Sequence, residues 1–303
     1  MKVLIIGGTK QEADADVRAY YQKYIDFFKK SADQVSQGTV VESCMMEDLL
    51  ISVGDGTFSI YDTHNNHDLS DYGAFFLRGD RFRSYMDVIA TINEFAFING
   101  IKIINEYSNV RDSSKLLQAV HFQKLDIPVA RTLYVNKALM NHQDKLGWEF
   151  PSVMKATHGS HGDDNYIVHS MDDVRRYQQE QPEKQFVLQR FVPNNGDYRI
   201  LVIGDEVLVI GRTAVGDSHL NNTSKGGEAV LVDINEIPEK VISDARKIMD
   251  YLGMTIAGVD ALADKNTNEY SFLEVNAQPQ LMSGAFIEEK ELLMGKLLDK
   301  LSH

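Results

Sequence analysis

The stretch GVDALADKNTNEYSFLEVN, residues 258–276, decides the architecture of the C-terminal part of this chain. Two short apolar segments, AGVDALA at 257–263 and YSFLEVN at 270–276, read as strands. The polar residues 264–269 between them are typical of a turn. The stretch therefore predicts an antiparallel hairpin. A hairpin that is symmetric about Thr267 also fixes which residues oppose one another.

Two carboxylates and one amide meet on one face of this hairpin. The symmetric register places Asp260 opposite Glu274, about 5 Å apart at Cβ, where like charges repel each other. Asn276 follows Glu274 by two positions and projects from the same face. A hard divalent cation such as Mg²⁺, which takes oxygen ligands, is the partner that this set favours. The alternative is an acidic hairpin in water, which the apolar neighbours of the acids disfavour: Val259, Ala261, Phe272, Leu273 and Val275.

Length, charge and cysteine content bound the class of protein. The chain has 303 residues, enough for two or three compact lobes. Its net charge of −13 argues against nucleic acid or an anionic membrane as a partner. The N-terminal MKVLIIGGTKQEAD lacks the cleavable apolar core of a signal peptide, and no run approaches a membrane span. Cys44 is the only cysteine, which fits a reducing cytosol, so we expect a cytoplasmic protein. Whether it forms a homo-oligomer is open.

Strands and helices alternate along the first part of the chain. Three apolar runs indicate strands of an open parallel sheet: residues 2–8, 74–77 and 101–104. Helical patterns cover residues 13–30 and 86–98, and an added hairpin is expected around residues 53–56. The glycines after the first strand lack the spacing of a dinucleotide or P-loop motif, so they are assigned to a turn of a substrate-side domain.

Three domains are predicted: residues 1–112, 113–187 and 188–303. The central domain opens with a helix over residues 113–125 that has a serine N-cap and ends before the Ile127–Pro128 step. The C-terminal domain carries the acidic hairpin and ends in a helix over residues 288–301.

A second candidate site follows the apolar strand 151–154. Lys155 ends this strand and precedes a small loop that can donate backbone N–H groups to phosphate oxygens. The loop residues concerned are Gly159, Ser160 and Gly162. Lys115 opens the earlier helix, and taken alone it reads as an exposed helix lysine.

A second hairpin, GDYRILVIGDEVLVIGR at 196–212, gathers charges at one end. Its two-residue Gly204–Asp205 turn sets Asp197 opposite Arg212, and Arg199 shares their face. A structural ion pair is one interpretation, worth about 0.2–1 kcal/mol if exposed. The functional interpretation has two guanidinium groups held for a phosphate or acyl phosphate, with Asp197 orienting one of them or binding a ribose hydroxyl.

Further arginines follow the strand at 74–77, in FFLRGDRFR. They stand at the carboxyl edge of a predicted parallel sheet, where open α/β sheets bind ligands. Arg78 and Arg81 are therefore candidates to hold a substrate carboxylate. A solvated loop is the alternative, and the sequence leaves both open.

Taken in order, these features resemble the ATP-grasp superfamily, most closely the RimK-like glutamate ligases. The resemblance runs from about Lys115 to Pro279. Four blocks carry it by their order and spacing: GDYRILVIGDEVLVIGR, NNTSKGG, IAGVDALA and FLEVNAQP. It implies an α/β chain with the ATP-grasp fold, in which an N-terminal open α/β lobe precedes two α+β lobes that clasp ATP.

The resemblance also implies roles for individual residues. Lys115 and Lys155 match lysines that bind the nucleotide phosphates, and Asp197 falls where the family contacts the nucleotide. The adenine hinge matches Gln189, Arg190 and Phe191, although the family usually has Glu at position 190. The phosphate loop carries Asp163 and Asp164 where the family has its third glycine.

For the reaction itself, Asn222 matches an asparagine near the γ-phosphate. Arg212 matches an arginine that stabilises the transferred phosphoryl group, and Arg199 lies beside it as a second catalytic cation. The ligands of Mg²⁺, or of Mn²⁺ in its place, match the acid–acid–amide set: Asp260, Glu274 and Asn276.

The activity implied is an ATP-dependent carboxylate–amine ligase. ATP activates a carboxylate as an acyl phosphate, and an amine displaces the phosphate to form an amide, with an amino acid or peptide as substrate. A catalytically reduced ATP-binding scaffold and a phosphotransferase of the same superfamily are the alternatives.

Overall fold

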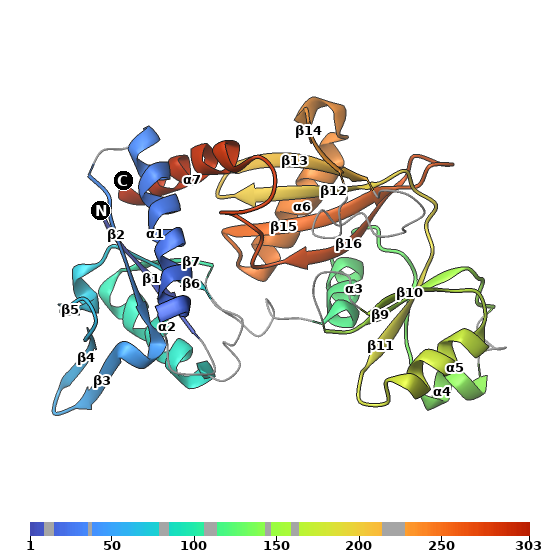
Figure 1. Cartoon of the computed structure of the whole chain (residues 1–303), viewed down its shortest axis with the longest axis horizontal. Coiled ribbons are helices and arrows are strands. Elements are labelled where there is room, and N and C mark those ends of the chain that lie inside the picture. The colour runs from blue at the N-terminus through green and yellow to red at the C-terminus, as the bar shows by residue number, and fades with distance from the viewer. Residues whose placement is uncertain are drawn as a thin grey trace.

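The computed structural model describes residues 1–8, 15–35, 38–78, 85–105, 114–142, 147–158, 164–213 and 228–303. Within these stretches, strands and helices form three lobes that follow one another along the chain (Figure 1). Both termini lie at the N-terminal lobe, because the last helix returns to it (Figure 1). Among the helices described, none has the length and apolar character that a membrane span requires.

Four parallel strands form the sheet of the N-terminal lobe, in the order β2-β1-β6-β7. Their bounds, with those of the two covering helices, are Lys2–Gly7 (β1), Val40–Met45 (β2), Ala74–Arg78 (β6), Lys102–Ile104 (β7), Ala15–Val35 (α1) and Met86–Asn99 (α2). β1 is apolar at consecutive positions because both of its faces are buried. Val3 and Ile5 pack with α1. Leu4 and Ile6 pack with α2. The predicted parallel sheet is confirmed, although α1 continues past its predicted end at Lys30.

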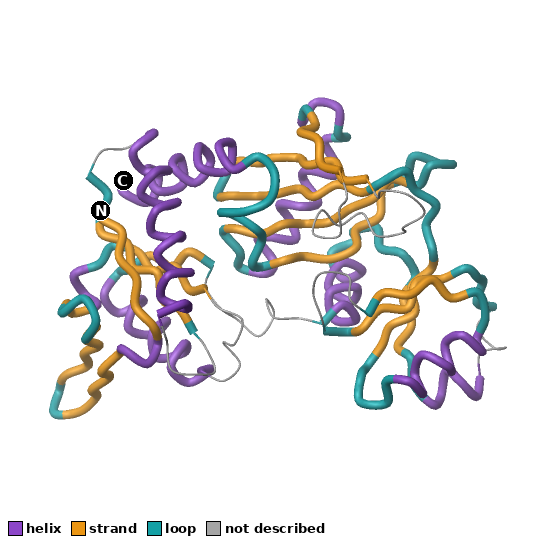
Figure 2. The backbone as a smooth tube through the Cα atoms, viewed as in Figure 1, coloured by secondary structure: helices purple, strands orange, loops and turns teal. Residues whose placement is uncertain are grey.

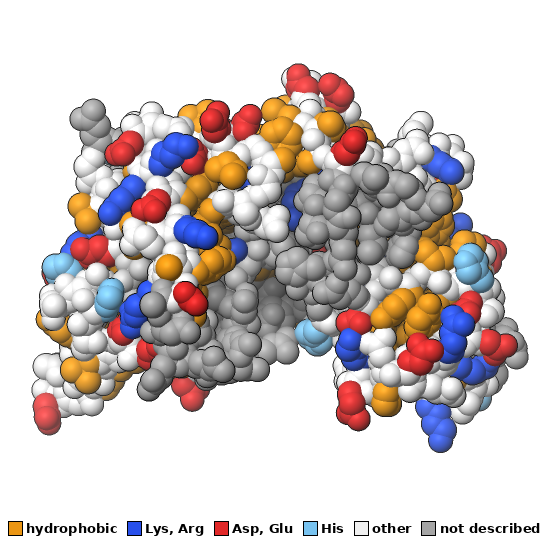
Figure 3. Space-filling model, viewed as in Figure 1, with side chains coloured by type: hydrophobic (Ala, Val, Ile, Leu, Met, Phe, Trp, Pro, Cys, Tyr) orange, Lys and Arg blue, Asp and Glu red, His pale blue; other side chains and the backbone are white. Residues whose placement is uncertain are grey.

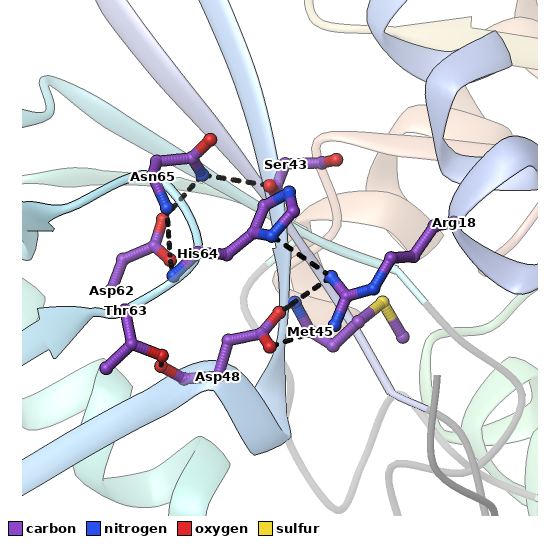
Figure 4. A network of polar contacts seen from close by, with 8 residues as sticks. All are labelled: Arg18, Ser43, Met45, Asp48, Asp62, Thr63, His64 and Asn65. Carbon is purple, nitrogen blue, oxygen red and sulfur yellow. Dashed lines mark hydrogen bonds and ion pairs between the residues drawn. The ribbon is translucent and has the colours of Figure 1, made fainter. Parts of the chain in front are cut away.

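The hairpin predicted around residues 53–56 is confirmed as part of a three-stranded antiparallel sheet. Its elements and the flanking 3₁₀ turns are Leu49–Gly54 (β3), Thr57–Asp62 (β4), His67–Asp68 (β5), Met46–Asp48 and Leu69–Asp71. Figure 4 shows how polar contacts tie this sheet to α1 and β2. Asp48 accepts hydrogen bonds of 2.9 and 3.0 Å from Arg18. Asn65 donates to the carbonyl oxygen of Ser43 over 2.9 Å.

The central lobe is a four-stranded antiparallel sheet in the order β10-β9-β11-β8. Its strands and helices are Thr132–Tyr134 (β8), Ser152–Ala156 (β9), Asn165–Val168 (β10), Phe186–Arg190 (β11), Lys137–His142 (α4) and Met171–Glu180 (α5). α4 and α5 lie together against one side of the sheet (Figure 2), where Met154, Phe186 and Leu188 form its apolar core. Since β11 continues to Arg190, the predicted domain boundary at 187 would fall inside a strand.

α3 (Lys115–Lys124) lies between the central and C-terminal lobes (Figure 1). Its N-cap is Ser114, whose side chain accepts a hydrogen bond from the Leu117 N–H over 3.3 Å. The helix predicted over 113–125 is therefore shorter than expected. Ser114 satisfies an N–H group that has no partner within the first helical turn. Residue 113 lies outside the described residues.

The C-terminal lobe is a five-stranded antiparallel sheet in the order β14-β13-β12-β15-β16. Its strands, the covering helix and a 3₁₀ turn are Asp197–Ile203 (β12), Glu206–Thr213 (β13), Glu228–Val232 (β14), Ile256–Ala263 (β15), Tyr270–Asn276 (β16), Glu239–Leu252 (α6) and Ile234–Glu236. α6 packs on one face of the sheet, over apolar residues that include Ile200, Val259 and Val275. The opposite face is apolar at one end, where Leu201, Ile203 and Ile256 pack with the last helix, and charged at the other, where Asp197 and Arg199 stand.

The last helix, α7 (Ile287–Ser302), joins the C-terminal lobe to the N-terminal one by packing against α1 (Figure 1). The two helices approach so closely at Gly295 that a Cβ atom there would overlap the carbonyl oxygen of Ser31. Acidic and basic side chains are interspersed over the N-terminal and central lobes (Figure 3).

Candidate functional site

Charged side chains gather on the face of the C-terminal sheet that α6 leaves uncovered. The strand register places Asp197 opposite Arg212 and Arg199 opposite Asp260. It also places Asp260 opposite Glu274. Both cross-strand pairings expected from the sequence, Asp197 with Arg212 and Asp260 with Glu274, are thus confirmed. Four strands contribute to one polar surface.

The pairing of Asp260 with Glu274 arises in a different way from the one predicted. The hairpin is not symmetric: Ala261 pairs with Phe272, and the register shifts between Asp260 and Ala261. Leu273 is the extra residue of a β-bulge. If the register beside the turn continued without a bulge, Asp260 would face Leu273. The bulge turns Glu274 and Asn276 away from the apolar core, which receives Phe272 and Val275 instead.

Asp260 is the centre of a buried network of ion pairs. Arg199 donates to it from Nε over 2.8 Å and from Nη2 over 2.7 Å. Arg212 lies 3.0 Å from the same carboxylate through Nη2, and its Nε donates to Asp197 over 2.6 Å. Asp260 and Arg212 are each only 4% exposed. The centre of this chain of alternating charges is therefore desolvated, its two ends at Arg199 and Asp197 are partly exposed, and it is not a surface ion pair.

The two carboxylates of this network differ in electrostatics. Burial disfavours the ionised form of both. For Asp260 the charges and hydrogen bonds of Arg199 and Arg212 outweigh burial and lower its pKa to about 2. Burial raises the pKa of Asp197. Arg212 acts to lower this pKa, and the negative charge of Asp260, which Arg212 also contacts, acts to raise it. The same carboxylates raise the pKa of Arg212 despite its burial. Asp260 is thus the firmly ionised member.

The two predicted phosphate lysines approach this network from the central lobe and α3. Lys115 Nζ lies 3.6 Å from Glu274 Oε2. Lys155 donates from Nζ to Gln189 Oε1 over 2.8 Å. Burial lowers the pKa of Lys155, while the charges of Glu274, Asp197 and Asp260 act in the opposite direction. The structure therefore brings the strand-end lysine and the acids of the C-terminal sheet into one electrostatic environment.

The remaining predicted residues fall into three groups. Gln189 is buried beside Lys155, whereas Arg190 is exposed and Phe191 half-buried at the end of β11. Asp164 forms an ion pair of 2.6 Å with Lys184. The others lie outside the described residues, and their roles stay predictions: Arg81, Gly159, Ser160, Gly162, Asp163 and Asn222.

Arg78 is not a solvated loop residue. Its side chain is buried at the carboxyl end of β6 and lies 5.1 Å from the centre of the Tyr24 ring. It donates from Nη2 to the carbonyl oxygens of Pro279 over 3.2 Å and of Gln278 over 3.4 Å. Arg78 thus contacts α1 and the segment that leaves β16, and its predicted role toward a substrate carboxylate stays a prediction.

Lys290 of α7 is a residue that the sequence did not point to. It is buried, and it donates to the carbonyl oxygen of Ser283 over 3.0 Å. Burial and the nearby charge of Arg199 lower its pKa to about 8. In the sequence Lys290 stands in an ordinary amphipathic helix. Its burial becomes visible only when α7 packs back against the sheet.

The oxygen donors predicted for a metal fit a hard cation. Within the described residues, no group of three His, Cys, Asp or Glu side chains is placed to hold a metal ion. The predicted set has two carboxylates and the amide of Asn276. A carboxylate has about four lone-pair sites, so Asp260 keeps acceptor capacity beside its two arginines. Asn276 Oδ1 accepts the Gln278 N–H over 2.9 Å, which fixes the amide. This chemistry suits Mg²⁺.

Residues 110–292 match the model of the RimK-like ATP-grasp domain. The chain belongs to the RimK-like ATP-grasp family. A probable alpha-L-glutamate ligase of Rhodopirellula baltica is 30% identical over 200 residues, covering 64% of this chain and 48% of the relative. The alpha-aminoadipate–LysW ligase LysX of Saccharolobus solfataricus is 28% identical over 192 residues, covering 60% of this chain and 67% of the relative. The matched segment thus spans about half of the first relative.

Solved ATP-grasp structures share the fold along the whole chain. A RiPP-associated ATP-grasp ligase of Chryseobacterium gregarium, in complex with ADP and a leader and core peptide, has a TM-score of 0.68 at 15% identity, covering 99% of this chain and 97% of that one. D-alanyl-alanine synthetase A of Vibrio cholerae has a TM-score of 0.66 at 12% identity, covering 100% and 98%. The predicted family and the α/β ATP-grasp fold are confirmed. The first two of these relatives are named as ligases.

Proposed function

We propose that this RimK-like ATP-grasp chain is an ATP-dependent carboxylate–amine ligase that forms an amide through an acyl phosphate. The observation that carries the proposal is the buried Arg199–Asp260–Arg212–Asp197 network facing Lys115 and Lys155. Burying so many charges is costly unless each is paired. A site that must hold a polyphosphate and a developing anionic transition state explains why they are there.

The nucleotide is assigned to the space between the central and C-terminal lobes. Lys155 and Lys115 neutralise its phosphate oxygens, and Asp197 contacts it. The end of β11, with Gln189, Arg190 and Phe191, binds adenine. Asp260, Glu274 and Asn276 would hold Mg²⁺ or Mn²⁺, which when bound offsets the charge on the β- and γ-phosphates.

The chemistry has two steps, and the residues act by positioning and by charge. In the first, a substrate carboxylate oxygen attacks the γ-phosphorus, the bond between the γ-phosphorus and the bridging oxygen breaks, and ADP leaves. In the second, an amine attacks the acyl carbon, its carbon–phosphate oxygen bond breaks, and phosphate leaves as the nitrogen loses a proton. Arg212 and Arg199 stabilise the charge that develops on the transferred phosphoryl group and the acyl phosphate.

The proposed substrates are an amino acid or peptide carboxylate and an amine. The names of two relatives, a glutamate ligase and a ligase of alpha-aminoadipate, support an acidic amino acid. The complex of the Chryseobacterium gregarium protein with a peptide supports a peptide. Arg78 and Arg81 remain the proposed carboxylate-binding residues. The buried, lone cysteine of the chain, Cys44, suits the cytoplasm as its location.

The test is ADP release measured against a panel of amino acids and peptides, with mass spectrometry of the products. A product heavier by an amino acid minus water identifies ligation, which is the expected result. A phosphorylated product would instead identify a phosphotransferase. Binding of ATP without substrate-dependent ADP release would identify a scaffold, and either of these two outcomes overturns the proposal.

A further inference from the structure

Three buried polar side chains hold the end of β16 and the segment that follows it. β16 is the edge strand of the C-terminal sheet. On its outer side Phe272 forms an isolated parallel bridge to Val129, and nearer the end of the strand the described residues supply no further strand. Gln118, Asn105 and Arg78 are each less than a tenth exposed. They come from α3, from the residue after β7 and from β6. Buried polar side chains are kept where they satisfy other buried groups.

Gln118 acts on the residue between the two proposed metal ligands of β16. Its Oε1 accepts the Val275 N–H over 2.9 Å, and its Nε2 donates to the Val275 carbonyl oxygen over 3.2 Å. This two-point contact replaces the hydrogen bonds that another strand would supply. It fixes the peptide units on which Glu274 and Asn276 stand.

Asn105 and Arg78 continue the contact beyond the strand. Asn105 donates to the carbonyl oxygens of Ile256 over 2.7 Å and Ala277 over 3.1 Å, and it accepts the Ile256 N–H. It therefore joins the start of β15 to the residue after Asn276. Arg78 then holds the carbonyl oxygens of residues 278 and 279. The N–H of residue 278 is the group that orients the Asn276 amide.

We propose that Gln118, Asn105 and Arg78 form a clamp of positioning residues that presents Glu274 and Asn276 to a divalent cation. Two of the three belong to the N-terminal lobe, so the substrate-side lobe helps to set the geometry of the cation site. The inference deepens the proposed function and rests on it for the cation. Partners that orient metal ligands change metal affinity by about 10–100-fold when they are lost.

Asn105 allows a clean test. Its φ of +59° lies in the left-handed region, which glycine adopts without strain, so Asn105→Gly removes the side chain and leaves the backbone geometry available. Asn268, in the β15–β16 turn, has a φ of +60° and is exposed, so Asn268→Gly is a matched control in the same hairpin. The second pair is Gln118→Leu with Gln123→Leu, an exposed glutamine of the same helix.

The experiment measures the dissociation constant of Mn²⁺ by electron paramagnetic resonance in the presence of saturating ADP, and that of ADP alone by calorimetry. Asn105→Gly is expected to weaken Mn²⁺ binding about tenfold, with ADP binding unchanged, while Asn268→Gly binds both as the wild type does. Wild-type Mn²⁺ affinity in Asn105→Gly overturns the clamp. If Asn105→Gly does not fold, Gln118→Leu decides by the same criterion. If neither variant folds, the clamp is a structural support only and the proposal is overturned.

A second readout separates this proposal from the proposed function. Hydrogen exchange of residues 274–278 is measured without nucleotide or metal, and faster exchange is expected in Asn105→Gly but not in Asn268→Gly. A wild-type chain that binds no Mn²⁺ with ADP refutes the proposed cation site itself. A wild type that binds Mn²⁺, with an Asn105→Gly variant that exchanges faster yet binds Mn²⁺ equally, refutes only the clamp.

Discussion

Replacing Asp260 with asparagine is expected to lower the free energy of unfolding by about 3–5 kcal/mol at pH 7, the range for breaking one partner out of a buried ion pair. Asparagine keeps the shape of the side chain but loses its charge. One of its two terminal atoms becomes a donor that faces the guanidinium donors of Arg199 or Arg212, which lie 2.7–3.0 Å away. Arg212 stays buried and Arg199 partly buried, both with less compensation of their charge. The cost therefore comes from the cations left behind.

The pH dependence gives an independent magnitude. The pKa of Asp260 lies at about 2 in the folded chain, against an ordinary value of 3.8. A lowered pKa means that the unfolded chain takes up the proton first, so this stabilisation is complete above about pH 4 and is lost as the pH falls to about 2. The gap corresponds to about 2 kcal/mol, since one pKa unit equals about 1.4 kcal/mol. Asp260→Asn removes this part of the acid sensitivity.

The measurement is urea unfolding followed by circular dichroism at pH 7 and between pH 4 and pH 2, for the wild type and Asp260→Asn. Asp55→Asn is the matched control, because Asp55 is exposed in the β3–β4 turn and asparagine tolerates its φ of +50°. The control should unfold within about 0.5 kcal/mol of the wild type. An Asp260→Asn variant as stable as the control would show that the carboxylate does not hold its two arginines, and the reasoning would fail.

Four further outcomes are expected. Glu274→Gln should abolish amine-dependent ADP release while the circular dichroism spectrum stays that of the wild type. Lys155→Met should raise the KM for ATP at least about tenfold in steady-state kinetics, since it removes a charge beside the phosphates. Gly295→Ala should destabilise the chain by about 1–3 kcal/mol in thermal unfolding, because α1 leaves no room for the methyl group. The pKa of Lys290 is lowered to about 8 in the folded chain, so the unfolded chain binds this proton more tightly. The free energy of unfolding should therefore rise between about pH 8 and 10. Lys290→Met should abolish this rise, measured by urea unfolding.

The sequence predicted the site better where its residues stand on local hairpins. Asp197 and Arg212 are joined by a two-residue turn, whose geometry fixes the register. The pairing of Asp260 with Glu274 was also predicted, but the bulge at Leu273 that produces it has no clear sequence signal. The pattern of apolar and polar residues in a strand does not show whether one residue is the extra residue of a bulge.

The contacts that could not be predicted are those made across long separations. Asn105 meets Ala277, and Gln118 meets Val275, with more than 150 residues between the partners. Each looks like an ordinary polar residue in its own segment. Periodicity and turn chemistry describe neighbours in sequence, whereas the placement of these side chains depends on how whole lobes dock.

The energetics of the buried charges connect stability to activity. Replacing a buried ion network with apolar residues of similar volume is often neutral or stabilising, so Asp260 and its arginines are poorly explained as a device for stability. Lys290 is buried with a lowered pKa, which costs stability at neutral pH. Both features concentrate on the sheet face that α6 leaves uncovered. A buried network of charges on one face, beside a strand held by buried amides, agrees with the proposed neutralisation of a polyanion there.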